Sequence, residues 1–301
     1  MERQVLFILS TNYAGSHYAS LLLGSHTCAA HLGEAKRLRK PDRPKPVCSA
    51  CGDAACVLFR GVTHENLDRL YQQVFENAGP GITLLVDNSK QPRWARRFLG
   101  HTPYRLRFLH LIRDPRALVR RWTLDHPSFA LRLDERLRLA RKAPGLALPV
   151  LLAPQRRVWV YKWLAQNRAI TRFLRENRLD HRVVSYRDLA LETERELRRL
   201  DEWLGLPFEP GQIEYWRFPH HGSQKAAYEW VKQRPERFLD TRWREFLGPA
   251  ESEAIRRSRR IGAYLAELGF VFAEDGLSRA APVGVPGASA RPLAAPSPGG
   301  P

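Results

Sequence analysis

The chain has 301 residues, of which 44% are hydrophobic and 10% aromatic, enough for one large globular domain or two small ones. Its formal net charge of +18 indicates an acidic ligand, an acidic macromolecule or an anionic surface, without choosing among them. The start of the sequence lacks the features of a secretory signal peptide, and no apolar run approaches transmembrane length. With only four cysteines, we expect a cytoplasmic protein without a disulfide framework.

Residues 4–24 have the pattern of a strand, a small polar loop and a helix. Val5 to Leu9 is long enough for one buried strand, the loop has Gly15 at its tightest point, and a helix resumes from Tyr18 to Leu23. The N-terminus of such a helix favours a phosphate, and Ser16 could add a hydroxyl donor. Because the sequence has neither GxxxxGK[ST] nor GxGxxG, an ordinary ATP-binding loop is not expected, and a unit without a ligand stays an alternative.

The segment from Gly24 to Phe59 is predicted to be rich in loops. Leu32-Gly33-Glu34 leads into KRLRKPDRPKP, whose charges and prolines suggest an exposed excursion on which Glu34 alone would be a surface charge. Three cysteines follow, and with a fourth ligand they could bind zinc. Because the second half of a zinc ribbon is missing, we expect reduced cysteines or a redox-labile pair, and no metal. The candidate zinc ligands are Cys48, Cys51 and Cys56, with Cys28, His26, His31 or His64 as the fourth.

Two more strands are predicted to end in polar loops that lead into helices. Ile82 to Val86 runs into Asp87-Asn88-Ser89-Lys90, and Arg105 to Ile112 ends in Arg113-Asp114-Pro115-Arg116. Repeated strand–helix units predict a mostly parallel sheet with right-handed crossovers, and the polar loops should meet at one edge. The helices expected around these strands are Asn66–Asn77, Pro92–Leu99 and one that begins at Ala117.

The second half of the chain is predicted to be mainly helical. An Arg-rich amphipathic stretch and a loop occupy Trp122 to Pro154; the stretch is interpreted as a solvated helix face, with an acceptor-side lid as the alternative. Residues 276–301 lack apolar periodicity and are predicted to be a disordered tail after a domain of residues 1–275. The other elements expected are helices at Val158–Asn177, 192–200 and Ser252–Leu268, and a strand at Arg182–Ser185.

Several of these motifs occur in the order and spacing of a known family. The sequence contains TNYAGSHYASLLLGSH, LGE, VDNSKQP, FLHLIRDPRALV, VVSYRDL, WLGLPF, HHGSQK and RWREFL. Over roughly residues 4–272 it resembles the bacterial PAPS-dependent sulfotransferases, where PAPS is 3′-phosphoadenosine 5′-phosphosulfate. The RDPRA motif preceded by DNSK is specific, whereas the first loop and the end of the chain match more loosely.

The resemblance implies a binding site for this nucleotide donor. In the family the first loop holds the 5′-phosphosulfate, the Arg of RDPRA holds the 3′-phosphate, and a Gly-containing segment near the C-terminus closes over the nucleotide. The donor-binding residues implied here are Tyr13, Ala14, Gly15, Ser16, His17, Tyr18, Arg113, Arg121, Tyr186, Gly222, Ser223 and Lys225.

The sequence departs from the family pattern at four of these positions. Tyr13 replaces the usual Lys or Arg of the first loop, which neutralises charge as the nucleotide leaves, and His17 replaces the usual Thr. Arg121 stands where a Ser is usual and could grip a phosphate bidentately, and Ser223 replaces Asn. Lys90 or protonated His17 are the candidate substitutes for the missing cation. Without one, the protein would bind the nucleotide and turn over slowly or not at all.

Glu34 is the candidate catalytic base by resemblance. In several bacterial members the carboxylate of a Gly-Glu pair after the first helix faces the acceptor hydroxyl. The turn that must bring Glu34 back to the sulfuryl group does not follow from the sequence, so the surface-charge interpretation stays open, and His17 is the second candidate.

We therefore expect a three-layer α/β sandwich with a mostly parallel central sheet and the P-loop NTPase-like topology of sulfotransferases. The expected activity moves a sulfuryl group from PAPS to an acceptor hydroxyl or amine and releases PAP, adenosine 3′,5′-bisphosphate. The alternative is a nucleotide- or phosphate-binding protein of the same fold with little or no turnover. A nucleic-acid binder would need a recognition helix or an aromatic stacking motif, and neither is found. The acceptor, whether carbohydrate, phenol, lipid or peptide, and the oligomeric state stay open.

Overall fold

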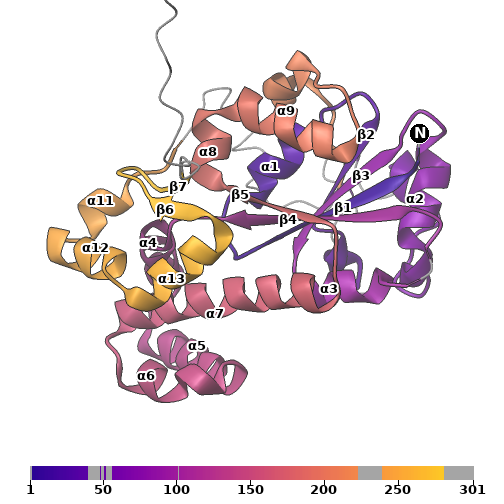
Figure 1. Ribbon diagram of the computed structural model, residues 1–301. Helices are drawn as coiled ribbons and strands as arrows, with labels where there is room; N and C mark the ends of the chain where they lie inside the picture. The colour runs from indigo at the N-terminus through magenta and orange to yellow at the C-terminus, as the bar shows by residue number, and fades with distance from the viewer. Residues whose placement is uncertain are drawn as a thin grey trace, which may run out of the picture.

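Strand β1 (Gln4–Ser10) lies in the middle of the central sheet in the computed structural model (Figure 1). The structure describes residues 2–39, 48, 51, 56–100, 102–222 and 239–280. Within them the central sheet has five strands in the order β2-β3-β1-β4-β5, and every neighbouring pair is parallel. The parallel α/β sheet predicted from the repeated strand–helix units is confirmed. The other four strands are β2 (Ala29–Gly33), β3 (Leu84–Lys90), β4 (Arg105–Ile112) and β5 (His181–Ser185).

Helices connect the strands and cover both faces of the sheet (Figure 1). Short 3₁₀ segments join several of them, and Ala35–Arg39 (η1) directly follows Glu34. The described helices are α1 (Ser16–Leu23), α2 (Leu70–Ala78), α3 (Pro92–Ala95), α4 (Pro115–Asp125), α5 (Phe129–Lys142), α6 (Ala147–Leu152), α7 (Gln155–Glu176), α8 (Tyr186–Leu191), α9 (Thr193–Leu204), α11 (Trp243–Phe246), α12 (Pro249–Arg256) and α13 (Arg259–Leu268).

Every residue of β1 is buried, because helices lie on both sides of it. Its alternating side chains enter two separate cores. Phe7 packs with residues of α2, α3 and α7 on one face, whereas Leu6 and Ile8 pack with α1, α8 and α9 on the other. The result is the three-layer sandwich expected from the sequence.

Two helices, α5 and α6, lie outside these layers (Figure 1). Helices α5 and α6 pack against the side of α7 that faces away from the sheet. The Arg-rich stretch is helical as predicted and mostly exposed, with Leu139 as its buried contact, whereas part of the segment predicted to be a loop forms α6. This arrangement fits the solvated-face interpretation of the stretch. Among the described residues, no helix has the length and apolar character needed to cross a membrane.

The structure corrects several of the predicted boundaries. Strand β3 does not end at Val86 but continues to Lys90, so the predicted polar loop is part of the strand. The helix expected over Ser252–Leu268 is two helices, because the chain turns at Arg257 and Ser258 between α12 and α13. Strand β6 (Phe270–Phe272) pairs with β7 (Leu277–Arg279), which lies within the stretch predicted to be a tail. Residues 281–301 of that stretch lie outside the described residues.

Candidate active site

The loop after β1 has the backbone shape that an anion site requires. Gly15 precedes α1 in the left-handed conformation, with φ of +97°, and a Cβ there would lie 2.2 Å from the Tyr186 ring. Ala14 and Ser16 are buried on either side of it. The first backbone N–H groups of a helix lack intrahelical partners, and the helix dipole adds positive potential at that end. This geometry suits a phosphate or sulfate group at the start of α1.

Strand β2, which the sequence did not reveal, carries the chain back from α1 and places Glu34 at the same edge of the sheet. Glu34 is only 8% exposed, so it is not the surface charge of the alternative interpretation. Its Oε1 accepts a hydrogen bond from Lys90 Nζ and lies 3.6 Å from His17 Nε2. Its Oε2 lies 3.4 Å from Lys36 Nζ and 3.3 Å from Arg37 Nε. The three residues proposed for catalysis, Glu34, His17 and Lys90, therefore lie together.

Burial and charge set the protonation states of this cluster in opposite directions. Burial would raise the pKa of Glu34, but the interaction with His17 and the charges of Lys90 and Lys36 outweigh it and hold that pKa well below its usual range. Burial lowers the pKa of Lys90 to about 8, although Glu34 opposes the shift. Burial also lowers the pKa of His17, again against the effect of Glu34. Near pH 7 Glu34 is therefore ionised and His17 neutral, so Lys90, and not His17, carries positive charge beside Glu34.

The end of β3 is distorted where it enters the site. The register between β1 and β3 shifts between Phe7 and Leu9, and Lys90 has a left-handed φ of +69°. Such a conformation is uncommon for a residue with a side chain, and it occurs often near functional sites. Here it accompanies the burial of the Lys90 side chain against Glu34.

A chain of hydrogen bonds lies behind the cluster. Asn88 Nδ2 donates to His17 Nδ1 at 3.0 Å and to Ser20 Oγ at 3.1 Å. Ser20 Oγ lies 2.9 Å from His31 Nε2, and His31 Nδ1 lies 3.0 Å from the carbonyl oxygen of His221. With its Nδ1 accepting from Asn88, His17 carries its proton on Nε2, which faces Glu34. These hydrogen bonds thus fix the orientation of His17 and link it to the segment at His221.

Asp87, the first residue of the DNSK motif, has a structural role. Its Oδ2 accepts hydrogen bonds from Tyr71 Oη at 2.5 Å and Trp94 Nε1 at 2.8 Å, and its Oδ1 accepts from the Ser89 backbone at 2.6 Å. Within the DNSK motif, Lys90 belongs to the cluster and Asn88 contacts His17, whereas Asp87 fixes the strand to α2 and α3.

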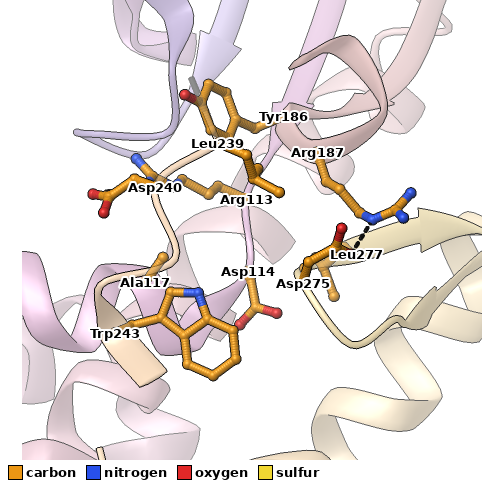
Figure 2. Close-up of a pocket in the computed structure, with 11 residues that line it drawn as sticks. Arg113, Asp114, Ala117, Tyr186, Arg187, Leu239, Asp240, Trp243, Asp275 and Leu277 are labelled. Atoms are coloured by element: carbon orange, nitrogen blue, oxygen red, sulfur yellow. Dashed lines mark hydrogen bonds and ion pairs between the residues drawn. The ribbon is translucent and has the colours of Figure 1, made fainter. Parts of the chain in front are cut away.

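Arg113, which directly follows β4, lines a pocket that Figure 2 shows. Its Nη1 donates to the carbonyl oxygen of Tyr13 at 2.8 Å, and its Nη2 lies 3.3 Å from Asp240 Oδ2. The guanidinium carbon lies 4.6 Å from the centre of the Tyr186 ring. Figure 2 shows Arg113 between Tyr186 and Asp240. Other residues that line the pocket are Asp114, Arg187, Trp243 and Asp275.

The next residues of the RDPR motif stabilise the start of α4. Asp114 accepts a hydrogen bond from the Arg116 backbone at 2.7 Å, and the two side chains form a buried ion pair at 2.7 Å. The Arg116 guanidinium lies 4.0 Å from the centre of the Trp243 ring. The motif therefore divides into one arginine that lines the pocket and one that fixes the helix N-terminus to α11.

Tyr13 and Arg121 lie in contact with each other. The Tyr13 hydroxyl donates to Asp125 of α4, and the Arg121 guanidinium lies 4.5 Å from the centre of the Tyr13 ring. Burial and the hydrogen bond to Asp125 raise the pKa of Tyr13, so its phenol stays protonated at neutral pH. Tyr13 therefore supplies no charge to the first loop, whereas Arg121 places a cation beside it.

The remaining predicted donor-binding residues divide into three groups. Tyr18 packs edge-on against Tyr186 and Tyr215, on the side of the core that includes α8 and α9. Gly222 has φ of +136°, and a Cβ on it would lie 2.5 Å from the Leu32 carbonyl, so its segment passes directly over the end of β2. Ser223 and Lys225 lie outside the described residues. Sequence reasoning missed Lys36, Arg37 and Asp240, which no recognisable motif singled out, and it gave Asn88 of the DNSK motif no role of its own.

Three of the cysteines come together around a residue that the sequence did not suggest. Cys48, Cys51 and Cys56 surround His221. The four residues proposed as a fourth ligand lie elsewhere: His26 contacts the Pro207 carbonyl, Cys28 adjoins His26, His31 contacts Ser20, and His64 is exposed beside Glu65. All four cysteines are among the described residues, and no disulfide joins them.

Comparisons with known proteins identify the fold. No protein-family model matches the sequence, and no curated protein matches it. Among solved structures, the chain is similar to the sulfotransferase domain from the curacin biosynthetic pathway, with a TM-score of 0.53 and 18% identity over 84% of this chain and 96% of that one. This protein has a sulfotransferase fold. The sulfotransferase domain from the Synechococcus PCC 7002 olefin synthase gives a TM-score of 0.52 at 16% identity, over 84% of this chain and 93% of that one.

Proposed function

We propose that the protein transfers a sulfuryl group from PAPS to an acceptor hydroxyl or amine and releases PAP. The observation that carries this proposal is the buried contact of Glu34 with Lys90 and His17 beside the N-terminus of α1. A carboxylate, a cation and backbone N–H groups at one point are the groups that sulfuryl transfer needs. The sulfotransferase fold supports the assignment of the reaction class.

In this reaction the acceptor oxygen attacks the sulfur of PAPS, and the bond between that sulfur and the phosphate oxygen breaks. The acceptor proton passes to Glu34, which is ionised at neutral pH and held in place by His17 and Lys90. Positioning and neutralisation of charge, rather than covalent catalysis, lower the barrier of such a loose in-line transfer.

Lys90 supplies the cation that Tyr13 cannot. In the protein alone its ammonium group contacts Glu34. A bound donor brings negative charge to the same place, so the ammonium group is shared between the phosphate oxygen of the leaving nucleotide and the carboxylate. As the pull of Lys90 on Glu34 weakens, the pKa of Glu34 rises, which makes it a better proton acceptor during transfer.

The second candidate function is binding of the same nucleotide with little or no turnover. It is favoured by Tyr13, because this position contributes no cation. Its side chain is a protonated phenol, which contacts Asp125. The two functions predict the same binding of PAP and differ only in product formation.

The test combines binding and turnover on one protein preparation. We expect PAP to bind saturably in calorimetry, with oligonucleotides as poor competitors. Incubation with PAPS and a metabolite extract should give products whose mass is higher by one SO₃ group. Binding without product would favour the second candidate, and binding of oligonucleotides with no response to PAP would contradict both.

Arg113→Ala is expected to weaken PAP binding by about 1.5–3 kcal/mol, the range for a charge-assisted hydrogen bond. Arg113 lies at a strand end beside the first loop, and we propose that its guanidinium exchanges Asp240 for the 3′-phosphate. Adenosine 5′-phosphosulfate lacks that phosphate and should lose much less affinity, as measured by calorimetry on both ligands. Equal losses for the two ligands would remove Arg113 from this role.

The value of kcat/KM for the donor is expected to fall as the pH rises through about 8. In the free protein the pKa of Lys90 is lowered to about 8, so above that pH Lys90 loses the proton that gives it its charge. Glu34 stays ionised over the same range, because its pKa is held low. Lys90→Arg should abolish this decrease, since arginine keeps its proton. An unchanged pH profile in Lys90→Arg would show that another group titrates.

A further inference from the structure

The cluster of Cys48, Cys51, Cys56 and His221 has the composition of a metal site. One ligand atom from each residue lies within 4.8 Å of all the others. His221 Nδ1 lies 3.0 Å from Cys51 Sγ and 3.7 Å from both Cys48 Sγ and Cys56 Sγ. His221 is 165 positions beyond Cys56 in the chain, so the fold, and not local sequence, brings these atoms together.

The distances fit one tetrahedral zinc ion. Zinc binds thiolate sulfur at about 2.3 Å and imidazole nitrogen at about 2.0–2.1 Å, so a tetrahedral site places sulfur and nitrogen about 3.6 Å apart. The three distances from His221 Nδ1, 3.0–3.7 Å, lie around that value. Soft sulfur ligands with one imidazole select zinc over magnesium or calcium, which prefer oxygen. A disulfide would use two of the sulfur atoms and would give no role to the third cysteine or to His221.

We propose that Cys48, Cys51, Cys56 and His221 bind a structural Zn²⁺ ion. Cys48 and Cys56 are buried, Cys51 and His221 are partly buried, and the four residues supply a complete set of protein ligands. A zinc site closed in this way stabilises the fold and leaves no position for a substrate. The sequence favoured reduced cysteines and no metal, because the second half of a zinc ribbon is missing, and His221 was not among the residues considered as the fourth ligand.

The position of this site connects the metal with the end of strand β2. The residue after His221 is Gly222, which packs directly on the Leu32 carbonyl at the end of β2. The backbone of His221 also accepts the hydrogen bond from His31 that continues through Ser20 and Asn88. The metal therefore fixes the 220–222 segment onto the strand that carries Glu34. Any effect on sulfuryl transfer rests on the proposed function, whereas binding of the metal does not.

The first test measures metal in the full-length protein, purified without a histidine tag. Elemental analysis should find about one zinc per chain, and a thiol-specific mercurial should release it into a colorimetric zinc indicator. Replacement by Co²⁺ should give the thiolate charge-transfer and tetrahedral d–d absorption bands of a sulfur-ligated ion. Protein that contains no zinc after growth with added zinc, or a disulfide between two of the three cysteines, would overturn the proposal.

The second test assigns the ligands. Cys51→Ser and His221→Asn should each lose most of the zinc, whereas Cys28→Ser, a buried cysteine outside the cluster, should keep it. Full zinc content in His221→Asn would remove His221 from the site. If a variant does not fold, the cobalt spectrum and the zinc release of the unmodified protein still decide whether the cysteines bind zinc. Calorimetry with PAP on the same samples keeps the two proposals apart, because failure to bind PAP leaves the zinc content unaffected.

Discussion

Glu34→Gln is expected to lower kcat for sulfuryl transfer by roughly 10²–10⁴-fold, the usual contribution of a general base. Glutamine keeps the size of the buried side chain and can still accept a hydrogen bond from Lys90, but it cannot take a proton from the acceptor. The affinity for PAP should change little, because the donor phosphates are expected at the first loop and at Arg113. Steady-state kinetics and PAP calorimetry on the same variant measure the two effects separately.

The chain provides a matched control for this substitution. Glu135 on α5 forms another largely buried ion pair between a glutamate and a lysine, with its Oε1 3.0 Å from Lys162 Nζ of α7. Glu135→Gln should therefore keep kcat while removing the same type of pair. A loss of less than tenfold in Glu34→Gln, with an acceptor whose proton must be removed, would exclude Glu34 as the base. His17 would then be the next candidate, because its Nε2 lies at the same carboxylate.

Lys90→Met is expected to lower kcat by about 10²–10³-fold, the usual cost of removing one preorganised group that stabilises developing charge. Methionine has a similar length and suits a buried site, but it places no charge on the leaving nucleotide. The loss should appear mainly in kcat, because negative charge on the leaving oxygen grows as the bond to sulfur breaks.

Lys162→Met is the control for that variant, since Lys162 is a second buried lysine whose pKa is lowered by burial and whose partner is a glutamate. Its substitution should leave sulfuryl transfer unchanged. A Lys90→Met protein that binds PAP and transfers sulfuryl groups at the normal rate would leave the role of the loop cation to Arg121 or to protonated His17.

The sheet could be predicted from the sequence because its inner strands are apolar runs followed by polar loops. Strand β1 is a fully buried run of this kind, and β4, which is buried from Arg107 to Ile112, was placed at its observed bounds. Strand β2 could not be predicted, because Ala29-Ala30-His31-Leu32-Gly33 is short, has few β-branched or aromatic residues and lies at the edge of the sheet. Because β2 was not predicted, the path that brings Glu34 back to the first loop could not be predicted either.

The candidate site could be predicted only where a motif marked it. Arg113, Lys90 and the first loop were found through their place at strand ends and through the family resemblance. Asp240 and His221 could not be found, because each reaches its position through contacts between distant parts of the chain. The burial of Glu34 could not be predicted either, because the segment KRLRK that follows it is typical of an exposed basic loop. In the structure, Lys36 and Arg37 of that segment contact the Glu34 carboxylate.

The position of β1 in the middle of the sheet has a consequence for how the chain folds during synthesis. Gln4 pairs with Leu84 on one side and with Arg105 on the other, so β1 is made long before either neighbour. At roughly 5–20 residues per second, a ribosome needs about 5–20 s to add the hundred residues between β1 and β4. The uncharged run Val5–Leu9, which is typical of aggregation-prone segments, has neither of its partner strands until β3 is made, and it lacks β4 for the whole of that time. Among the strands of the central sheet, β1 is therefore the one that waits longest between its own synthesis and that of its last partner.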